Sequence, residues 1–319
     1  MDDNPAPTTP SLTPRAIEAA REPRRAYTKL IGAALFLVLS ISLARLPANA
    51  QQDSHASTAA AASLQAQAGA VAAPERSEDS AAKDAAQNPV AAAISLPFQN
   101  NTYYGVGPYR RAENALLIEP VIPFKLSSKW MVISRTITPV EVVPRLSPTR
   151  EVDYGLGNIQ PQFYMSPVHP GKFIWGAGPQ LWLPTATDST LGTNKWGGGP
   201  AFVGLVHQGH WLGGSLLGNE FAGVNHKHIN QMTLNPFLYY NMPHGWYFVS
   251  APIITSEWTA SRSTRWTVPL GGGAGRVFKL GDQPLNARAQ FFNDVRTTTG
   301  GPDWQLQTQL QFLFIKKKR

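Results

Sequence analysis

Hydrophobic and polar positions alternate most regularly near the end of the chain, along residues 303–315. Apart from one threonine, one parity carries apolar side chains: Trp304, Leu306, Thr308, Leu310, Phe312 and Phe314. The other parity carries amides: Gln305, Gln307, Gln309 and Gln311. Successive side chains of a β-strand point to opposite faces, so this segment predicts a strand with one apolar and one amide face.

Such a strand fits two architectures. In a water-soluble sandwich, the apolar face would join the core and the amides would face bulk water. In an outer-membrane barrel, the apolar face would meet lipid and the amides would line the lumen. A tilted strand of this length crosses the hydrocarbon layer. Whether the pattern repeats along the chain decides between the two.

Turn residues recur from Ile94 onward and divide the chain into strand-sized pieces. The short turns are at 127–128, 167–171, 208–210, 243–245 and 281–283. The longer loops are at 105–113, 144–153, 185–194, 223–228, 259–263 and 298–302. This alternation separates twelve strands, as in barrels with short periplasmic turns and long external loops. The sequence therefore predicts an all-β fold, a closed antiparallel transmembrane β-barrel of about 12 strands, over residues 93–315.

The two-faced pattern recurs in 116–125, 159–166, 230–241 and 285–294. It fails in 130–142, where placing Arg135 in the lumen turns Ser134, Thr136 and Thr138 towards lipid. A bulge is the one explanation that the pattern offers. Eight tryptophans lie near strand ends, where headgroups favour an apolar ring with a wet N–H: Trp130, Trp175, Trp196, Trp211, Trp246, Trp258, Trp266 and Trp304.

Prolines also stand inside the expected strands. They are Pro120, Pro139, Pro161, Pro179, Pro200, Pro236, Pro252 and Pro269. Because proline cannot donate to the strand ladder, each should mark a missing hydrogen bond or a bulge. Two explanations stay open: bends that curve a small barrel, or a weakened wall through which an apolar solute leaves sideways.

The composition agrees with a barrel of many strands. Charged residues make up only 15% of the 319 residues, whereas Gly and Pro number 27 each and Trp 9. Cysteine is absent, which excludes disulfides and thiolate metal sites. The formal net charge is +8, but the basic residues do not form a stripe interleaved with stacking aromatics. Nucleic-acid binding is therefore not expected.

The N-terminal segments indicate export. Arg24, Arg25 and Lys29 precede an apolar run at 30–44, and Ala48-Asn49-Ala50 supplies small residues for cleavage. We expect a signal peptide over 1–50, with an uncleaved anchor as the alternative. Residues 51–92 are rich in Ala, Gln and Ser and predict a disordered or partly helical periplasmic tether. Residues 316–319 form a basic tail.

A set of short motifs resembles a known family. It includes Pro120-Val121-Ile122-Pro123-Phe124, the stretch from Gly178 to Pro200 around Leu183-Pro184-Thr185-Ala186-Thr187-Asp188, Asn235-Pro236-Phe237, Trp266-Thr267-Val268-Pro269 and the final strand. Over about 94–315 the chain resembles the bacterial outer-membrane barrel family associated with meta-pathway phenol degradation, whose members are described as transporters. The resemblance implies an outer-membrane barrel with a transport role. The basic tail departs from barrels that end on an aromatic residue.

The histidines suggest two alternatives, a metal site and a catalytic site. His226 and His228 could share a strand face and hold a surface metal, although a solvated loop explains them as well. Outer-membrane phospholipases are also twelve-stranded barrels, but His207, His210 and His244 fall at expected periplasmic turns, and no serine follows them at a catalytic spacing. We therefore expect no enzyme activity, cofactor or resident metal.

The lumen is the better candidate for function. Its expected lining mixes amides, aromatics and few charges: Glu119, Arg135, Gln160, Gln162, Tyr164, Trp182, Gln231, Asn235, Phe237, Tyr239, Arg288, Gln305, Gln307, Gln309 and Gln311. Such a lining suits small, weakly polar or aromatic solutes. We predict an outer-membrane channel that passes small hydrophobic or aromatic compounds by passive diffusion. The alternative is a non-conducting structural or surface-binding barrel. Expected partners are the lipid bilayer, a small solute and the barrel-assembly machinery. Whether residues 94–104 form a strand or a plug stays open.

Overall fold

The computed structural model describes residues 78–144, 152–193, 195–223 and 229–315. The expected signal peptide, the tether up to residue 77, the basic tail and the pair His226/His228 lie outside these ranges. Among the described residues, no helix is both long and apolar enough to cross a membrane.

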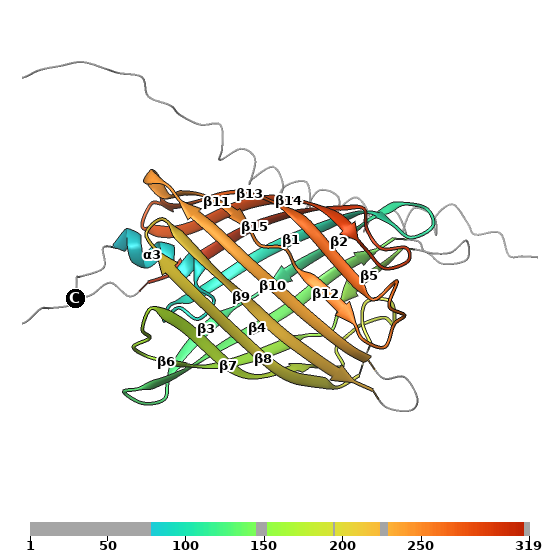
Figure 1. The fold of residues 1–319 in the computed structure, drawn as a ribbon, viewed down its shortest axis with the longest axis horizontal. Helices are drawn as coiled ribbons and strands as arrows, with labels where there is room; N and C mark the ends of the chain where they lie inside the picture. Colours follow the sequence, from blue (N-terminus) through green and yellow to red (C-terminus); the bar gives the residue numbers. More distant parts are fainter. Residues whose placement is uncertain (1–77, 145–151, 194, 224–228, 316–319) are drawn as a thin grey trace, which may run out of the picture. The chain divides into compact units, whose positions relative to one another are not determined.

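The described chain forms one helix, a short 3₁₀ turn and a single antiparallel sheet (Figure 1). The helix is α3 (Glu78–Gln87), and the turn is η1 (Pro243–Gly245). The strands are β1 (Ile94–Val106), β2 (Arg111–Ile118), β3 (Val121–Lys125), β4 (Trp130–Val143), β5 (Asp153–Leu156), β6 (Gln160–Pro167), β7 (Phe173–Trp182), β8 (Gly197–Gln208), β9 (Trp211–Ala222), β10 (Ile229–Asn241), β11 (Trp246–Ser250), β12 (Ile254–Glu257), β13 (Trp266–Leu280), β14 (Gln283–Arg296) and β15 (Trp304–Phe314).

The sheet closes on itself. The first and last strands pair in register from Ile94 opposite Phe314 to Tyr104 opposite Trp304. Three wall strands are interrupted once: β2 and β3 share the neighbours β1 and β4, β5 and β6 share β4, and β11 and β12 share β10 and β13. Fifteen segments therefore make twelve wall strands, which confirms the predicted closed antiparallel barrel.

Proline explains two of the three interruptions. Pro120 separates β2 from β3, and Pro252 lies between β11 and β12. Neither residue has an N–H to give to the ladder. The backbone of Pro120 still accepts a bond from the N–H of Thr136 at 3.1 Å, so the wall stays continuous on its acceptor side. At these positions the in-strand prolines mark breaks between two segments of one wall strand.

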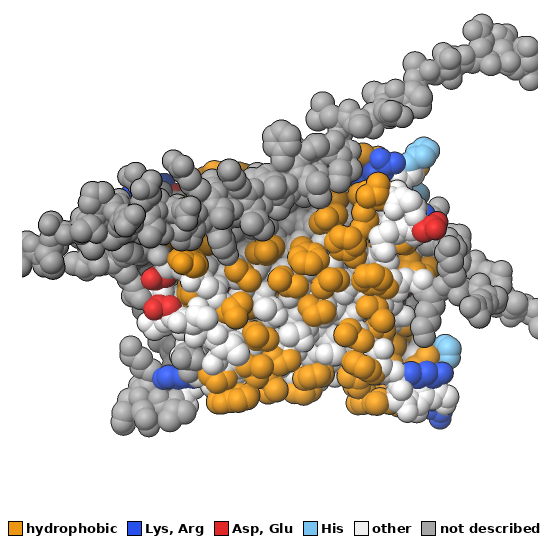
Figure 2. All heavy atoms as spheres, turned by 180° about the vertical axis from the view of Figure 1, so that it is seen from behind, with side chains coloured by type: hydrophobic (Ala, Val, Ile, Leu, Met, Phe, Trp, Pro, Cys, Tyr) orange, Lys and Arg blue, Asp and Glu red, His pale blue; other side chains and the backbone are white. Residues whose placement is uncertain are grey.

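The alternation expected along β15 holds in the structure. The four glutamines from Gln305 to Gln311 are 4–8% exposed, whereas Leu306 is 36% and Phe314 47% exposed. Gln290 on β14 donates to Gln307 at 2.6 Å, and Asn286 donates to Gln311 at 3.0 Å. Figure 2 shows the other side of the wall, where hydrophobic side chains spread between charged groups at the two ends. The amides therefore face inward and the apolar side chains outward.

Aromatic side chains gather at both ends of the barrel. At the end with short turns, Trp130 packs edge-on against Trp175 at 6.1 Å between ring centroids, and Trp211 contacts Tyr240 at 4.8 Å. At the end with long loops, the rings of Trp258 and Trp266 lie 5.6 Å apart. This arrangement matches the interfacial aromatic belts of membrane barrels.

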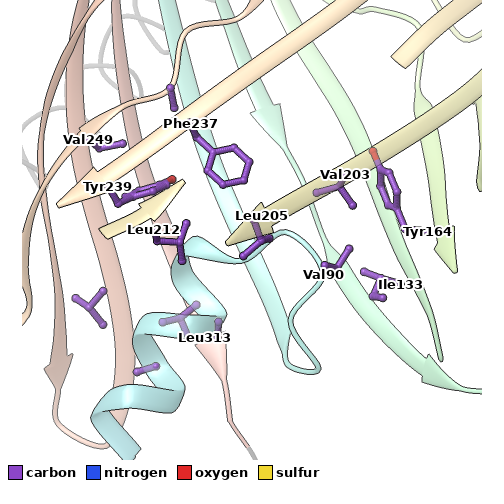
Figure 3. Close-up of a cluster of buried hydrophobic side chains, with 14 of the residues drawn as sticks. Val90, Ile133, Tyr164, Val203, Leu205, Leu212, Phe237, Tyr239, Val249 and Leu313 are labelled. Atoms are coloured by element: carbon purple, nitrogen blue, oxygen red, sulfur yellow. The ribbon is translucent and has the colours of Figure 1, made fainter. Parts of the chain in front are cut away.

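The segment before the first strand packs into the end of the barrel with short turns. We call residues 78–92, which comprise α3 and the residues that follow it, the plug (Figures 1 and 3). Ala82, Ala85 and Val90 of the plug are buried in the main apolar cluster. From the sequence, residues 78–92 are expected in the tether, and 94–104 could be either a strand or a plug. The structure makes 94–106 a wall strand and places the segment before it against the lumen wall.

Alanine suits this position for a physical reason. A helix that lies inside a closed wall needs a narrow, apolar surface, and alanine combines the highest helix propensity with the smallest apolar side chain. Two polar contacts add orientation. The amides of Gln87 and Asn241 donate to each other at 2.9 and 3.1 Å, and Gln311 donates to the carbonyl of Ala85 at 3.5 Å.

Candidate functional site

The lumen holds three successive cavities. The inner cavity, of about 90 Å³, lies against the plug. The middle cavity, of about 260 Å³, shares Glu119, Arg135, Asn235 and Arg288 with the inner one. The outer cavity, of about 400 Å³, shares Glu141 with the middle one and is bordered by the loop at 298–302. The shared residues place the three cavities in series from the plug to the long loops.

The structure places the expected lining residues on the inner side of the wall. Thirteen of the fifteen line one of the three cavities: Glu119, Arg135, Gln160, Gln162, Tyr164, Asn235, Phe237, Tyr239, Arg288, Gln305, Gln307, Gln309 and Gln311. The other two, Trp182 and Gln231, occupy the same parity of their strands as the lining residues Gln180 and Thr233. A role for any of them in binding or transport remains a prediction.

A charged layer made of Glu119, Arg135 and Arg288 separates the inner from the middle cavity. Arg135 donates to Glu119 at 2.9 Å and to Gln162 at 3.3 Å. Because the Glu119 side chain is only 6% exposed, this pair is largely withdrawn from water and each charge depends on the other.

The second guanidinium of this layer has neutral partners. Arg288 donates to the hydroxyl of Tyr239 at 3.0 Å and to the amide oxygen of Gln99 at 2.9 Å. These contacts reach from β14 to β10 on one side and to β1 on the other. Among the described residues, no ion pair compensates the positive charge of Arg288, although its N–H groups are partly satisfied by these hydrogen bonds.

Amide side chains join one another around the lumen wall. Gln162 donates to Gln180 at 3.2 Å, and Gln309 donates to Gln311 at 3.2 Å. The hydroxyl of Tyr164 donates to Gln162 at 3.1 Å. Amides that satisfy one another stay fixed and expose few free donors, so they form a weakly polar lining. An apolar or aromatic solute therefore enters this lumen at a lower free-energy cost than a strongly hydrated solute does.

Several lumen residues were not expected from the sequence. Gln99 and Asn101 lie on β1, whose role was left open, and both are buried on the inner face. Gln180 and Glu220 are each 3% exposed and line the middle cavity. The inner parity of β9 mixes Glu220 with Leu212, Leu216 and two glycines, which hides the alternation. An ideal Cβ on Gly218 would lie 2.3 Å from Nε2 of Gln180, so this glycine makes room for the amide.

The wall is irregular where β7, β8 and β9 meet. Pro179 and Pro200 stand directly opposite each other in neighbouring strands, so neither can donate across the pair. An apolar groove of about 780 Å³ lies beside them, bordered by Phe202 and Met232 among others. Leu217 and Gly218 line both this groove and the middle cavity. Of the two explanations for the in-strand prolines, the geometry at this site fits a weakened wall most clearly.

The catalytic and metal candidates lie away from the lumen or outside the described residues. His207 is the last residue but one of β8, His210 contacts the carbonyl of Asn241 at 2.9 Å through Nδ1, and His244 lies in η1 at φ 58°. All three are at the end with short turns, as the sequence predicts. In the described ranges, no group of three His, Asp or Glu side chains has metal-binding geometry.

Comparison with known proteins identifies the fold. No family model and no curated protein sequence matches the chain. Among solved structures, an outer membrane channel from Pseudomonas putida F1 matches with a TM-score of 0.53 and 14% identity, covering 70% of this chain and 94% of that one. The porin KdgM in complex with disordered oligogalacturonate gives 0.39 and 10%, covering 70% and 100%. Outer membrane phospholipase A from Escherichia coli gives 0.37 and 11%, covering 72% and 94%. At this identity, the first likeness shows that the chain has the fold of an outer-membrane channel.

Proposed function

We propose that the protein is an integral outer-membrane channel that passes small hydrophobic or aromatic compounds by passive diffusion. The observation that carries the proposal is the series of three cavities along the lumen, lined by mutually bonded amides and aromatic rings. Export through a cleaved signal peptide, assembly by the barrel-assembly machinery and membership of the phenol-associated barrel family belong to the same proposal. The absence of a catalytic role is part of it as well.

The plug limits how a solute completes its passage. It occupies the end with short turns, which is the periplasmic end in barrels of this kind. A solute in the middle cavity therefore leaves either when the plug moves or through the wall. The apolar groove beside Pro179 and Pro200 lies across the wall from that cavity, so it offers a sideways path into lipid.

A second candidate function has its own observation. The plug fills one end of the lumen with buried apolar contacts, as a non-conducting structural or surface-binding barrel would require. In that case the cavities would be spaces between packed side chains and the lumen would carry nothing. The two functions differ in one measurable property, the flux of solute.

Blocking the lumen should reduce uptake of an apolar probe. Gln307 lines the middle cavity and Gln309 the inner one, so Gln307→Trp/Gln309→Trp fills the route on both sides of the charged layer. We expect cells that produce the wild-type chain to take up N-phenyl-1-naphthylamine several-fold faster than cells that produce this variant. The measurement is the rate of fluorescence gain in a host whose own outer membrane excludes the probe.

The matched control is Leu306→Trp/Leu310→Trp, which adds the same two rings to the outer face of the same strand. Uptake should then stay at the wild-type rate, provided that both variants reach the membrane in equal amounts. Equal uptake with and without the lumen tryptophans would favour the non-conducting barrel.

In the same assay, Met232→Trp fills the apolar groove. Slower uptake with this variant would support the sideways path, and an unchanged rate would exclude it.

A further inference from the structure

The lumen contains a buried carboxylate without a counter-charge. Glu220, on β9, is 3% exposed, and its Oε2 has no hydrogen-bond partner among the described residues. The residue lines the middle cavity, so the free oxygen belongs to a side chain at the edge of an open space. A carboxylate removed from water is costly unless a cation or several donors compensate it.

The surrounding protein groups do not supply that compensation. Neither guanidinium group of the cavity forms an ion pair with Glu220 in the described part of the chain: Arg135 donates to Glu119 and Gln162, and Arg288 donates to Tyr239 and Gln99. The indole N–H of Trp182 lies near the Glu220 carboxylate but lacks hydrogen-bond geometry. Even with better geometry, a neutral N–H could satisfy a lone pair but not the charge.

The charge balance of the cavities points the same way. The middle cavity is lined by three carboxyl groups, of Glu119, Glu141 and Glu220, and by two guanidinium groups, so its formal charge is −1. The outer cavity is lined by Glu113 and Glu141, and its lining includes no Lys, Arg or His. A solute that enters from the long loops therefore meets two carboxyl groups and no positively charged side chain among the described lining residues of the outer cavity, which favours cations.

The rest of the middle cavity has an apolar part. Ile137, Leu216 and Ile253 line it together with Tyr164. A solute with a charged head and an apolar body would thus find both of its parts matched within one cavity. A bare inorganic cation would leave the apolar lining unused, and a neutral hydrocarbon would leave the carboxylate unpaired.

We infer that the middle cavity is a binding site for small cationic amphiphiles, with a protonated amine at Glu220 and an aromatic or aliphatic body against Ile137, Leu216 and Ile253. An ammonium group carries three donors, which is sufficient for Oε2 of Glu220 and the neighbouring acceptors of the amide lining. This inference deepens the proposed function, because it names a class of solute that the lumen selects.

Three probes of one shape test the inference. Benzylamine is cationic at neutral pH, benzyl alcohol is neutral and benzoate is anionic. Binding is measured by calorimetry on the full chain in nanodiscs of zwitterionic lipid, with empty nanodiscs as the baseline. We expect benzylamine to bind about tenfold more tightly than benzyl alcohol and benzoate to bind least, a tenfold step being that of one modest charge interaction.

Removing the charge should remove the preference. Glu220→Gln keeps the size of the side chain, and we expect it to weaken benzylamine binding about tenfold while benzyl alcohol binds as before. Glu220→Asp retains the charge and should keep the order of the three probes. Asp282→Asn removes one carboxylate from the exposed turn between β13 and β14 and should change nothing. Heat-modified migration on gels verifies that each variant is folded.

The outcomes separate this inference from the proposed function. Equal binding of benzylamine to the wild type and Glu220→Gln, or equal binding of benzylamine and benzyl alcohol to the wild type, would overturn the cation site. Uptake of the neutral naphthylamine probe depends on an open lumen rather than on Glu220. The channel proposal can therefore stand when the cation site fails, and benzylamine binding can persist when the uptake assay shows no passage.

Discussion

Deleting residues 78–92 is expected to raise the single-channel conductance of the protein several-fold in planar lipid bilayers. An α-helix with its side chains is about 10–12 Å across, so α3 takes up much of the cross-section of a small barrel. The plug is held by Ala82, Ala85 and Val90 in the apolar cluster and by the amide pair Gln87–Asn241. Its removal leaves the charged layer as the next obstacle along the lumen.

Fixing the plug in place should have the opposite effect. The chain contains no cysteine, so Gln87→Cys/Asn241→Cys introduces the only two thiols. A short, reducible bis-methanethiosulfonate then bridges the plug and β10. We expect openings to cease on cross-linking and to return on reduction. The control pair is Asn100→Cys/Asn114→Cys, whose parent amides are bonded at 3.0 Å between two wall strands.

Two results would contradict the role of the plug in limiting conductance. If the chain that lacks residues 78–92 conducts no better than the full chain, then another part of the lumen sets the conductance. The charged layer, with Arg135 paired to Glu119, would be the first place to look. If the wall cross-link in β1 and β2 reduces current as much as the plug cross-link does, the effect comes from cross-linking itself.

An arginine on the outer face of β15 should destabilise the barrel far more than one on its inner face. Leu310 lies mid-strand on the apolar parity, opposite Phe98 and Ala287. Leu310→Arg should lower the free energy of unfolding by about 2–4 kcal/mol, as for arginine at the lipid midplane of other barrels. Gln307→Arg instead points into the middle cavity, whose lining has a formal charge of −1.

Both changes in the free energy of unfolding are measured by reversible denaturant titration of the protein in phospholipid vesicles. The inner arginine loses the bond that Gln290 donates to Gln307, which costs about 1 kcal/mol, but it stays solvated and gains carboxylate neighbours. The order of the two variants is the prediction. A larger loss for Gln307→Arg than for Leu310→Arg would mean that the faces of β15 are assigned the wrong way round.

The fold could be predicted because the features that define a barrel strand lie in residues that are neighbours in the sequence. Each wall strand is short and two-faced, and turn residues separate it from the next, so neighbouring residues alone define strands such as β15. Each of the five short turns and six longer loops expected from the sequence coincides with a connection between strands, although several overlap the adjoining strand ends by one to three residues. The irregular strand 130–142 was the exception. Arg135 does line the lumen, and Ser134, Thr136 and Thr138 lie on the opposite parity, but β4 pairs with β3 and β6 here without the expected bulge. The structure explains only the apolar residues on the inner parity of this strand.

Met131 and Ile133 look misplaced because the plug is their partner. Both are buried on the same parity as Arg135, at the end of β4 with short turns, and both belong to the apolar cluster around Val90 (Figure 3). A strand next to a water-filled lumen would carry polar residues at these positions. Apolar residues on the inner parity near the short turns, such as Val203 and Leu313, were the available signal for a plug.

The candidate site was predictable only in part. The amides of β15 stand out because their neighbours are apolar, whereas Glu220 is hidden among Leu216 and the glycines of β9. Glu220 is important because no other strand among the described residues supplies a positively charged partner for its carboxylate; the candidate on β4, Arg135, pairs with Glu119. Pairing of side chains across a barrel is not local information. A single sequence therefore shows which residues face inward better than it shows which of them lack partners.

The most direct test of the closed, outside-apolar barrel is a spin-label scan of β15 in lipid vesicles. Each residue from Gln305 to Phe312 is replaced in turn by a labelled cysteine, which the cysteine-free chain permits. The account predicts that labels at Leu306, Leu310 and Phe312 are relaxed mainly by oxygen, which concentrates in lipid, and that labels at the glutamines are relaxed mainly by a water-soluble nickel complex. Equal accessibility on both parities, or the reverse alternation, would contradict it.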